Sequence, residues 1–448
     1  MRVLQKIVDV KEHEVSTLLL SVVYFFFILS SYYVIRPIRD EMGVAGGVDN
    51  LPWLFTGTMV GMIIANPIFA SLVVKLPRHR FIPLAYRIFI LQLLIFFLLL
   101  TILSKTQSIW VGRIFYIWTS IFNLFVVSIF WSFMIDIFAV EQGKRLFGFI
   151  SVGGTLGSVL GAAVTSILSE RLGPVNLLLI SALLLEVGVQ CARRFPVFVT
   201  ISQDPTQQST VRENVIGGGV LAGVKHVYAS PYMLGICAYM LIFTITNTFL
   251  YFQQSDIAAR NFVDRAARTA FFAKIDLVVN ILTVLIQVFL TGRVMRFLGV
   301  SITLALLSII SLAGFTVVGV KPILALIVAF QILRRVGNLG FARPAREVLF
   351  IVLSPEDKYK AKSFIDTFIF RTGDQIGAWA YPALNWLGFS IAKIPFVAIP
   401  LSLIWLVVSI WLGHQQAVMV SNSQESESHA EIVVTKMSDE HIPVSDPT

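Results

Sequence analysis

The sequence has 448 residues, of which 56% are hydrophobic and only 14% charged, and its mean hydropathy is +0.80. Soluble proteins carry roughly a quarter charged residues, so this composition excludes an ordinary soluble multidomain protein and indicates a chain that lies in a bilayer. The formal net charge of +9 comes from Lys and Arg in short runs between apolar segments. Such runs are typical of membrane-protein loops, and no nucleic acid polymer is expected as a partner.

About twelve apolar stretches are long enough to cross a bilayer, since a spanning helix needs roughly 20 mainly apolar residues. They are expected to begin near Val15, Leu51, Phe81, Ile109, Phe147, Val175, Tyr232, Thr269, Val300, Pro322, Ser363 and Ile391. The first stretch is too long for the apolar part of a signal peptide, so it is expected to be a retained span. The sequence thus predicts an all-α membrane protein with about twelve transmembrane helices in two six-helix bundles.

Polar segments divide this pattern. Residues 196–230 hold three consecutive glycines and a polar run, which predict a cytoplasmic linker. The linker separates an N-terminal six-helix half, residues 1–195, from a C-terminal six-helix half, residues 231–415. Residues 416–448 are rich in Ser, Glu and Asp and predict a disordered cytoplasmic tail. Loops rich in Lys and Arg alternate with poorer ones, so both termini are expected to face the cytoplasm.

A weak internal repeat indicates that the two halves are related. The segment from Phe27 to Asp40 lies about 216 positions before the segment from Phe243 to Asp256, with Phe and Asp matching at either end. Two parallel six-helix halves are typical of transporters of the major facilitator type. A row of glycines at three- and four-residue steps predicts a face packed closely against another helix; these are Gly153, Gly154, Gly157 and Gly161.

Charged and aromatic residues close the first span: Tyr33, Arg36, Arg39 and Asp40. On a helix, Asp40 lies one turn beyond Arg36, so these side chains share one region. Charges inside a membrane are costly unless paired or hydrated, and a guanidinium offers paired donors to phosphate or carboxylate. This predicts an anion-binding platform with Asp40 as counter-ion. The alternative is an interfacial cap whose arginines reach lipid head groups or only brace Asp40.

The C-terminal half offers further candidates for substrate binding. Arg371 and Asp374 are three residues apart in the eleventh span and share a face, so they predict a latch of an alternating-access cycle or a static structural pair. Asn247 and Gln253 of the seventh span are expected to face the first span as polar ligands. The span-ten neighbours Arg334 and Arg335 cannot both face the lumen.

Two acids are candidates for coupling, Glu186 in the sixth span and Asp276 in the eighth. Removing a carboxylate from water favours its protonated form, which suits it to carrying a proton. The alternative for Asp276 is an ion pair near Lys274. A proton or a counter-anion is therefore expected as coupling partner. The sequence contains no P-loop, HExxH, nucleophile elbow or CxxC pattern, so no catalytic residue, metal site, cofactor or enzymatic activity is expected.

Several short motifs resemble a known family. They are Tyr33 to Asp40 (YVIRPIRD), Phe130 to Phe133 (FWSF), Gly153 to Gly157 and Lys362 to Asp366 (KSFID). With these motifs the chain resembles the ATP:ADP antiporter, or nucleotide transporter, family of intracellular bacteria and plastids and its wider bacterial relatives. The resemblance implies that Arg39 stands at the family's basic residue of the first span, with Arg36 at its preceding arginine.

The sequence also departs from the family pattern. The acid of the fourth span is replaced near Thr119, and the acid of the seventh span falls near Phe249. The basic residue of the eleventh span falls near Asp374, one turn from Arg371. This arrangement still resembles an anion transporter, for which another anionic metabolite fits as well as ATP and ADP.

Together these features predict a secondary active transporter in a bacterial inner membrane. It is expected to move an organic anion, with a nucleotide as one candidate, by alternating access, either as an antiporter or coupled to protons. Its expected partners are a small anionic substrate and the lipid bilayer. The alternative is a non-transporting membrane scaffold or receptor with the same fold, which would bury its charges in fixed pairs without a path for water.

Overall fold

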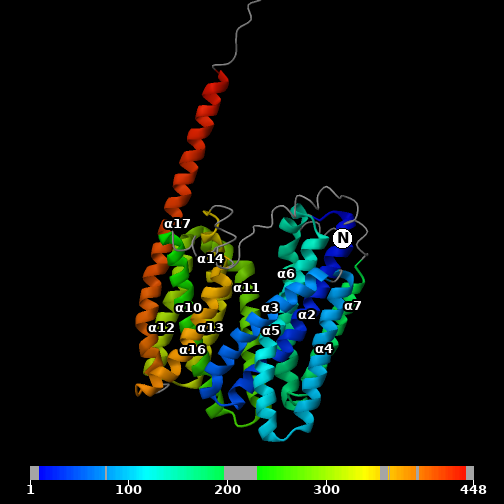
Figure 1. The fold of residues 1–448 in the computed structure, drawn as a ribbon. Helices are drawn as coiled ribbons and strands as arrows, with labels where there is room; N and C mark the ends of the chain where they lie inside the picture. Colours follow the sequence, from blue (N-terminus) through cyan, green and yellow to red (C-terminus); the bar gives the residue numbers. More distant parts are fainter. Residues whose placement is uncertain are drawn as a thin grey trace, which may run out of the picture.

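A computed structural model describes residues 10–75, 78–195, 230–353, 362, 364–389 and 393–439. In this part of the chain every regular element is a helix. After the short 3₁₀ helix η1 (Glu12–Glu14), the N-terminal half consists of α2 (Val15–Ala45), the 3₁₀ helix η2 (Val48–Asn50), α3 (Leu51–Lys75), α4 (Arg78–Ile102), α5 (Lys105–Ile137), α6 (Val140–Leu172) and α7 (Leu177–Arg193). These helices lie at the right of Figure 1.

The second group of helices begins at Pro231. Its first helix starts with a proline that follows the cap residue Ser230, whose hydroxyl accepts a hydrogen bond from the Met233 N–H. The elements are α10 (Pro231–Asn261), α11 (Arg265–Ile286), the π-helical η3 (Gln287–Thr291), α12 (Gly292–Val320), α13 (Leu324–Gly337), the π-helical η4 (Asn338–Ala342), α14 (Arg343–Leu349), the π-helical η5 (Ile365–Ile369), α16 (Phe370–Trp386) and α17 (Ile394–Asp439).

Nine helical stretches among the described residues are long and apolar enough to cross a membrane. One of them, Arg265–Val320, contains Gly299 with φ 73°, a left-handed conformation that interrupts the helix and separates two spans. Two further helices, α7 and α16, have 17 residues each and fall just short of the 18-residue length. Counted in this way, the described residues hold twelve spans, as predicted, and the all-α membrane fold is confirmed.

The predicted linker and tail have different outcomes. Residues 196–229 lie outside the described residues, so the linker is not described apart from Ser230. The helix α17 continues to Asp439, so the structure describes residues 416–439 as helix where the sequence predicted disorder. The reason is that no glycine or proline interrupts the chain between Gly413 and Pro443. Residues 440–448 lie outside the described residues.

Small residues let α6 approach α2 closely. A Cβ atom on Gly153 would lie 2.3 Å from the carbonyl oxygen of Val22, and one on Gly157 would lie 2.2 Å from the carbonyl oxygen of Phe26. The backbones of the two helices are therefore in direct contact, which only glycine permits. The prediction that these glycines form a close-packing face is confirmed.

The same kind of contact recurs in the second half, between α16 and α10. A Cβ atom on Gly373 would lie 1.8 Å from the Thr244 hydroxyl oxygen, and one on Gly377 would lie 3.1 Å from the carbonyl oxygen of Ile245. The fifth span thus packs on the first through glycines, and the eleventh packs on the seventh. This correspondence agrees with the internal repeat of the sequence.

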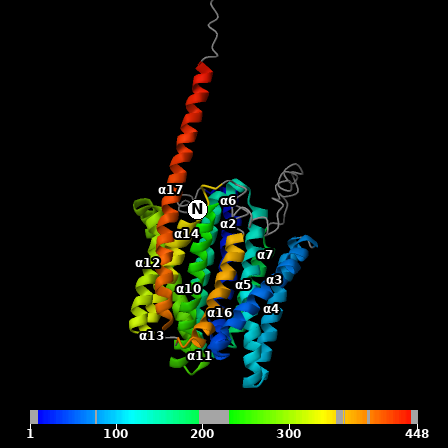
Figure 2. The same cartoon turned by 60° about the vertical axis from the view of Figure 1, so that its left-hand side comes forward.

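The two groups of helices have separate cores and also meet each other. One buried cluster contains only residues between Val10 and Phe195, and a second contains only residues between Tyr232 and Leu412. A third cluster joins residues of both groups, such as Tyr116 and Phe249. Contacts of α11 with α2 and α6, and of α3 with α16, also cross between the groups. Figure 2 shows the same helices from another direction, with α3 and α4 at the right.

Two sides of the bundle are distinguished below. The terminal side is the side on which α2 begins at Val15 and from which the C-terminal part of α17 extends (Figure 1). The far side is the side on which α2 ends at Ala45.

An ion pair fixes the start of the first span on the terminal side. The Glu14 carboxylate accepts hydrogen bonds from the Lys11 backbone N–H at 3.0 Å and from the side chains of Gln142 and Arg145 at 2.8 and 2.9 Å. Burial raises the pKa of the Glu14 carboxyl, but these hydrogen bonds outweigh burial and lower it below its usual value of 4.5.

This lowered pKa predicts a pH dependence of stability. A carboxyl whose pKa is lower in the folded state contributes stability above its unfolded pKa and loses this contribution as the pH falls through the folded pKa. The variant Glu14→Gln is therefore expected to unfold at a lower temperature than the wild type at pH 7, and the difference should shrink below about pH 4.5. Thermal unfolding of both proteins in detergent, at pH 7 and at a pH below about 4.5, measures this. A difference in unfolding temperature between the two proteins that is the same at the two pH values would contradict the prediction.

Candidate functional site

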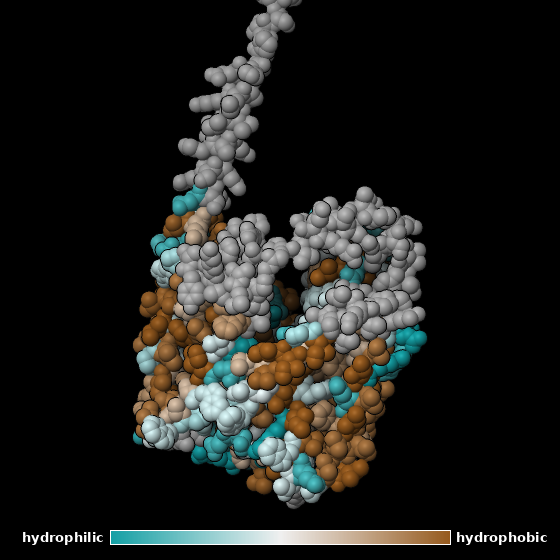
Figure 3. Space-filling model, viewed as in Figure 1, coloured by the Kyte–Doolittle hydropathy of each residue, from teal (hydrophilic) through white to brown (hydrophobic). Residues whose placement is uncertain are grey.

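A cavity of about 650 Å³ lies between the two groups of helices. Its wall is formed by α2, α3 and α5 from the N-terminal half and by α10, α11, α13, η4, α14, η5 and α16 from the C-terminal half. The lining reaches Arg346 and Glu347 near the terminal-side end of α14. Figure 3 shows the surface hollowed between the halves on this side, while apolar residues cover much of the outer surface. The size is within the usual range for small-molecule sites.

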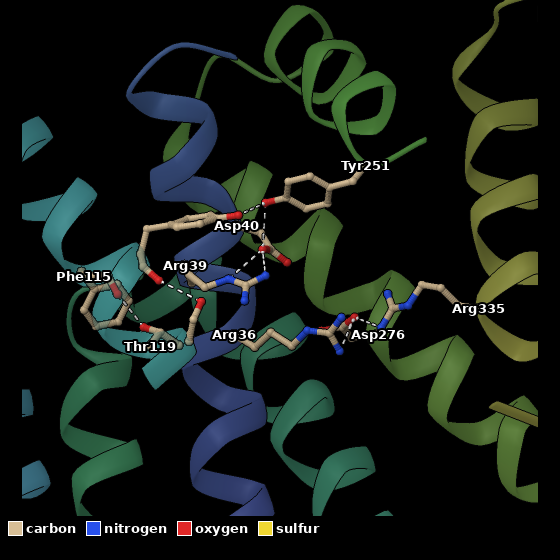
Figure 4. Close-up of polar contacts among 10 residues, drawn as sticks. Arg36, Arg39, Asp40, Phe115, Thr119, Tyr251, Asp276 and Arg335 are labelled. Carbon is tan, nitrogen blue, oxygen red and sulfur yellow. Dashed lines mark hydrogen bonds and ion pairs between the residues drawn. The ribbon is translucent and has the colours of Figure 1, made fainter. Parts of the chain in front are cut away.

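Three charged residues from both halves meet in this cavity. Arg36 of α2 lies with Nη1 3.5 Å from Oδ1 of Asp276 on α11, and Arg335 of α13 lies with Nη2 2.6 Å from the same oxygen. Figure 4 shows the two guanidinium groups on either side of the carboxylate. The predicted counter-ion of Arg36 was Asp40, and the structure pairs Arg36 with Asp276 instead. Sequence spacing gave no sign of this pair because its members lie on different halves.

A second group joins the halves beside it. The Arg39 guanidinium pairs with Oδ1 of its neighbour Asp40 at 2.6 Å, and the Tyr251 hydroxyl of α10 donates to the same oxygen at 3.1 Å. The hydroxyl groups of Tyr251 and Tyr116 lie 3.2 Å apart, and Arg39 stacks over the Tyr116 ring. Figure 4 shows Arg39, Asp40 and Tyr251 above the pair formed by Arg36 and Asp276.

Other predicted ligands also line the cavity. Tyr33 and Asn247 belong to the wall, as do Arg371 and Asp374, whose charged groups lie 3.4 Å apart on α16. Gln253, in contrast, is buried and does not belong to the cavity wall, whereas its neighbour Gln254 does. The spacing predicted the correct helix and turn, but not which of two adjacent glutamines faces inward.

The predicted coupling residue Glu186 lies elsewhere. It is on α7 and pairs with Arg87 of α4 at 3.1 Å, and it also accepts a hydrogen bond from Gln190. About half of the Arg87 side chain and a third of the Glu186 side chain are exposed, and neither residue belongs to the cavity wall. A carboxylate outside the cavity is poorly placed to couple to a bound molecule, so the structure argues against this role.

The two neighbouring arginines of α13 point to different environments. Arg335 lines the cavity, while Arg334 is 1% exposed inside the C-terminal half. The Arg334 guanidinium donates to the carbonyl oxygens of Thr246 and Phe243 at 2.8 and 3.1 Å and lies near the Trp405 ring. Its place in the core agrees with the helical geometry that keeps adjacent residues from sharing one face.

Sequence reasoning missed the tyrosine hydroxyls. Tyr116 and Tyr251 lie within apolar runs that looked like ordinary lipid-facing or core segments. The two positions at which the family resemblance implied acids, Thr119 and Phe249, do not line the cavity. Thr119 is buried and its hydroxyl donates to the carbonyl oxygen of Phe115, and Phe249 is also buried. The adjacent Ser120 does line the cavity.

On the far side, the halves are joined by a buried carboxylate. Glu41 near the end of α2 is fully buried and accepts hydrogen bonds from Arg265 and Arg268 of α11, the closest at 3.1 Å. The rings of Trp53 on α3 and Trp379 on α16 also meet between the halves, with their centroids 4.8 Å apart. These contacts join the two halves on the far side. We call Glu41, Arg265 and Arg268 the far-side ion cluster.

The fold and the cavity define a membrane transporter built from two six-helix halves. The chain belongs to the Major Facilitator Superfamily, whose family model matches residues 15–262, more than half of the chain. Among known proteins, it is similar to ADP,ATP carrier protein 2 of Chlamydia pneumoniae, with 20% identity in an alignment that covers 87% of each chain. The resemblance to the ATP:ADP antiporter family is thereby confirmed.

Solved transporter structures show the same fold. A D-xylose–proton symporter aligns with a TM-score of 0.59 at 11% identity, covering 89% of this chain and 96% of that one. A bacterial homologue of the human lysosomal transporter Spinster gives 0.53 at 13% identity, with 92% and 96% covered. The nucleoside transporter NupG gives 0.51 at 14% identity, with 92% and 99% covered. The families in these comparisons are transporters and not enzymes.

Proposed function

We propose that this protein is a secondary active transporter of an organic anion, with nucleotides as the leading candidates. The observation that carries the proposal is the convergence of arginines from both halves on one cavity. Arg36 and Arg39 come from α2, Arg335 from α13 and Arg371 from α16. Guanidinium groups bind phosphate and carboxylate through paired hydrogen bonds, and they do so most strongly where water is scarce.

The remaining wall suits the rest of a nucleotide. Aromatic rings of Tyr33, Phe55 and Phe272 offer surfaces on which a base can stack, and the amides of Asn247 and Gln254 offer donors and acceptors for its edge. The similarity to an ADP,ATP carrier and to a nucleoside transporter points in the same direction.

The proposed mechanism is alternating access of the cavity between the two halves. In this structure the cavity extends toward the terminal side, and the far-side ion cluster joins the halves on the other. Under the positive-inside rule the basic loops favour a cytoplasmic terminal side, and with this orientation the cavity would open inward in a bacterial inner membrane. Rocking of the halves would break the far-side contacts and open the cavity outward.

The coupling partner is proposed to be a counter-anion or a proton. Two acids of the wall, Asp276 and Asp374, pair with arginines that also face the cavity. An anion bound to these arginines competes with the two carboxylates for the same guanidinium groups. Occupancy of the site is thereby linked to the charge state of the two carboxyl groups. The residues proposed to bind the substrate are therefore Tyr33, Arg36, Arg39, Asp40, Asn247, Arg371 and Asp374, with Asp276 in the coupling.

Uptake into proteoliposomes tests this function. Vesicles are preloaded with unlabelled nucleotide, other organic anions or buffer, and labelled ATP, ADP and organic anions are offered outside with and without a pH gradient. Uptake that needs internal anion indicates antiport, and uptake that needs the gradient indicates proton coupling. Absence of uptake of every anion by correctly folded protein would favour a non-transporting scaffold or receptor.

A further inference from the structure

We call Arg36, Asp276 and Arg335 the triad, and their charged groups differ in how they face the cavity. The Asp276 side chain is 3% exposed, whereas the side chains of Arg36 and Arg335 are 21% and 17% exposed. Both arginines point to the same carboxylate oxygen, Oδ1. The acid therefore lies behind the two guanidinium groups, which keep other N–H donors available on the cavity side.

The triad carries an unbalanced charge. Two guanidinium groups share one carboxylate, which leaves one positive charge in excess. The neighbouring pairs Arg39–Asp40 and Arg371–Asp374 are each balanced. An unbalanced charge at a poorly hydrated site favours a ligand of opposite sign, and the free-energy gain grows with the charge that the ligand brings.

The position of the triad makes this excess relevant to the transported molecule. Arg36 belongs to the first half, while Asp276 and Arg335 belong to the second, and all three line the cavity. An anion held by both arginines therefore touches both halves. Its charge adds to that of Asp276, so the carboxylate and the ligand compete for the same two cations.

We infer that Asp276 sets the charge of the anion that the cavity selects, acting as a fixed internal counter-anion between Arg36 and Arg335. This inference rests on the proposed function and assigns the selectivity to one residue. With Asp276 in place, the two arginines have a single net charge to offer. Without it they offer two, and the site favours more highly charged members of a series.

The test is a comparison of affinities for adenosine mono-, di- and triphosphate, measured by isothermal titration in detergent without divalent cations at constant pH and ionic strength. For Asp276→Asn, the affinity for the triphosphate relative to the monophosphate is expected to rise about tenfold over the wild-type ratio. Asp276→Glu keeps the charge and should keep the ratio.

Two controls make the result decisive. Glu186→Gln removes a carboxylate outside the cavity and should leave the ratio unchanged. Arg335→Gln lowers the triad charge by one and should shift the ratio the other way, which tests the inference even if Asp276→Asn does not fold. Unchanged ratios in folded Asp276→Asn or Arg335→Gln would overturn the inference while leaving the transporter proposal intact. A wild type that binds none of the three nucleotides would overturn the inference and the nucleotide candidates, whereas transport of other organic anions is decided by the uptake assay.

Discussion

Replacing Arg36 by alanine is expected to reduce anion transport by roughly 30-fold to several thousand-fold. Removing one partner of a buried charge pair costs about 2–5 kcal/mol, and about 1.4 kcal/mol corresponds to a tenfold change. Arg36 pairs with Asp276 across the two halves, so the change removes both a ligand for the substrate and a contact between the halves. Initial rates of uptake into proteoliposomes measure the effect.

A matched control is available in Arg87→Ala. Arg87 also lies on a membrane helix and also pairs with an acid, Glu186, but outside the cavity. It is expected to change uptake by less than about threefold, since partly exposed pairs contribute about 0–1 kcal/mol. Arg36→Lys should be intermediate, because a lysine keeps the charge but not the paired donors. Equal losses for Arg36→Ala and Arg87→Ala would indicate a folding defect instead of a substrate site.

Replacing Glu41 by glutamine is expected to open the far side. Glu41 is fully buried and holds Arg265 and Arg268 of the other half, and breaking such a buried cluster costs about 3–5 kcal/mol. This cost falls only on the state in which the far side is closed, so the population of the opposite state should rise by roughly 100-fold or more.

Cysteine labelling detects this shift. Ser120 lines the cavity, and the native Cys191 and Cys237 are buried, so they are replaced by alanine first. In Ser120→Cys, a membrane-impermeant maleimide added from the far side should react much faster when Glu41→Gln is also present. Glu170→Gln, an exposed residue at the end of α6, is the matched control and should leave the labelling rate unchanged. Equal labelling of all three proteins would show that the far-side ion cluster does not hold the halves together.

Much of the fold is predictable from the sequence because each span is local. A run of about 20 apolar residues must form a helix in lipid, whatever its partners are. The predicted starts at Val15 and Leu51 coincide with the starts of α2 and α3. The break near Val300 was also predictable, since Gly299 interrupts the helix there.

The site was less predictable because its contacts join distant parts of the chain. Arg36 and Asp276 are far apart in sequence, and no local spacing indicates that they meet. The spacing of Arg36 and Asp40 suggested a pair on one helix, while the structure gives Asp40 to Arg39 and to Tyr251 of the other half. Glu186 shows the opposite error, in which the sequence suggested a functional acid where the structure has a partly exposed ion pair. An acid within an apolar run can be balanced by an arginine of a neighbouring helix, here Arg87, outside the cavity.

The glycine contact between α6 and α2 has a practical consequence. Since the backbone of α6 at Gly157 touches the backbone of α2 at Phe26, the two helices cannot slide past each other without a collision. Arg36 must then travel together with α6 during each transport cycle. A fluorophore on Arg171, exposed near the end of α6, would report this travel from outside the cavity and leave every ligand-facing atom in its native form.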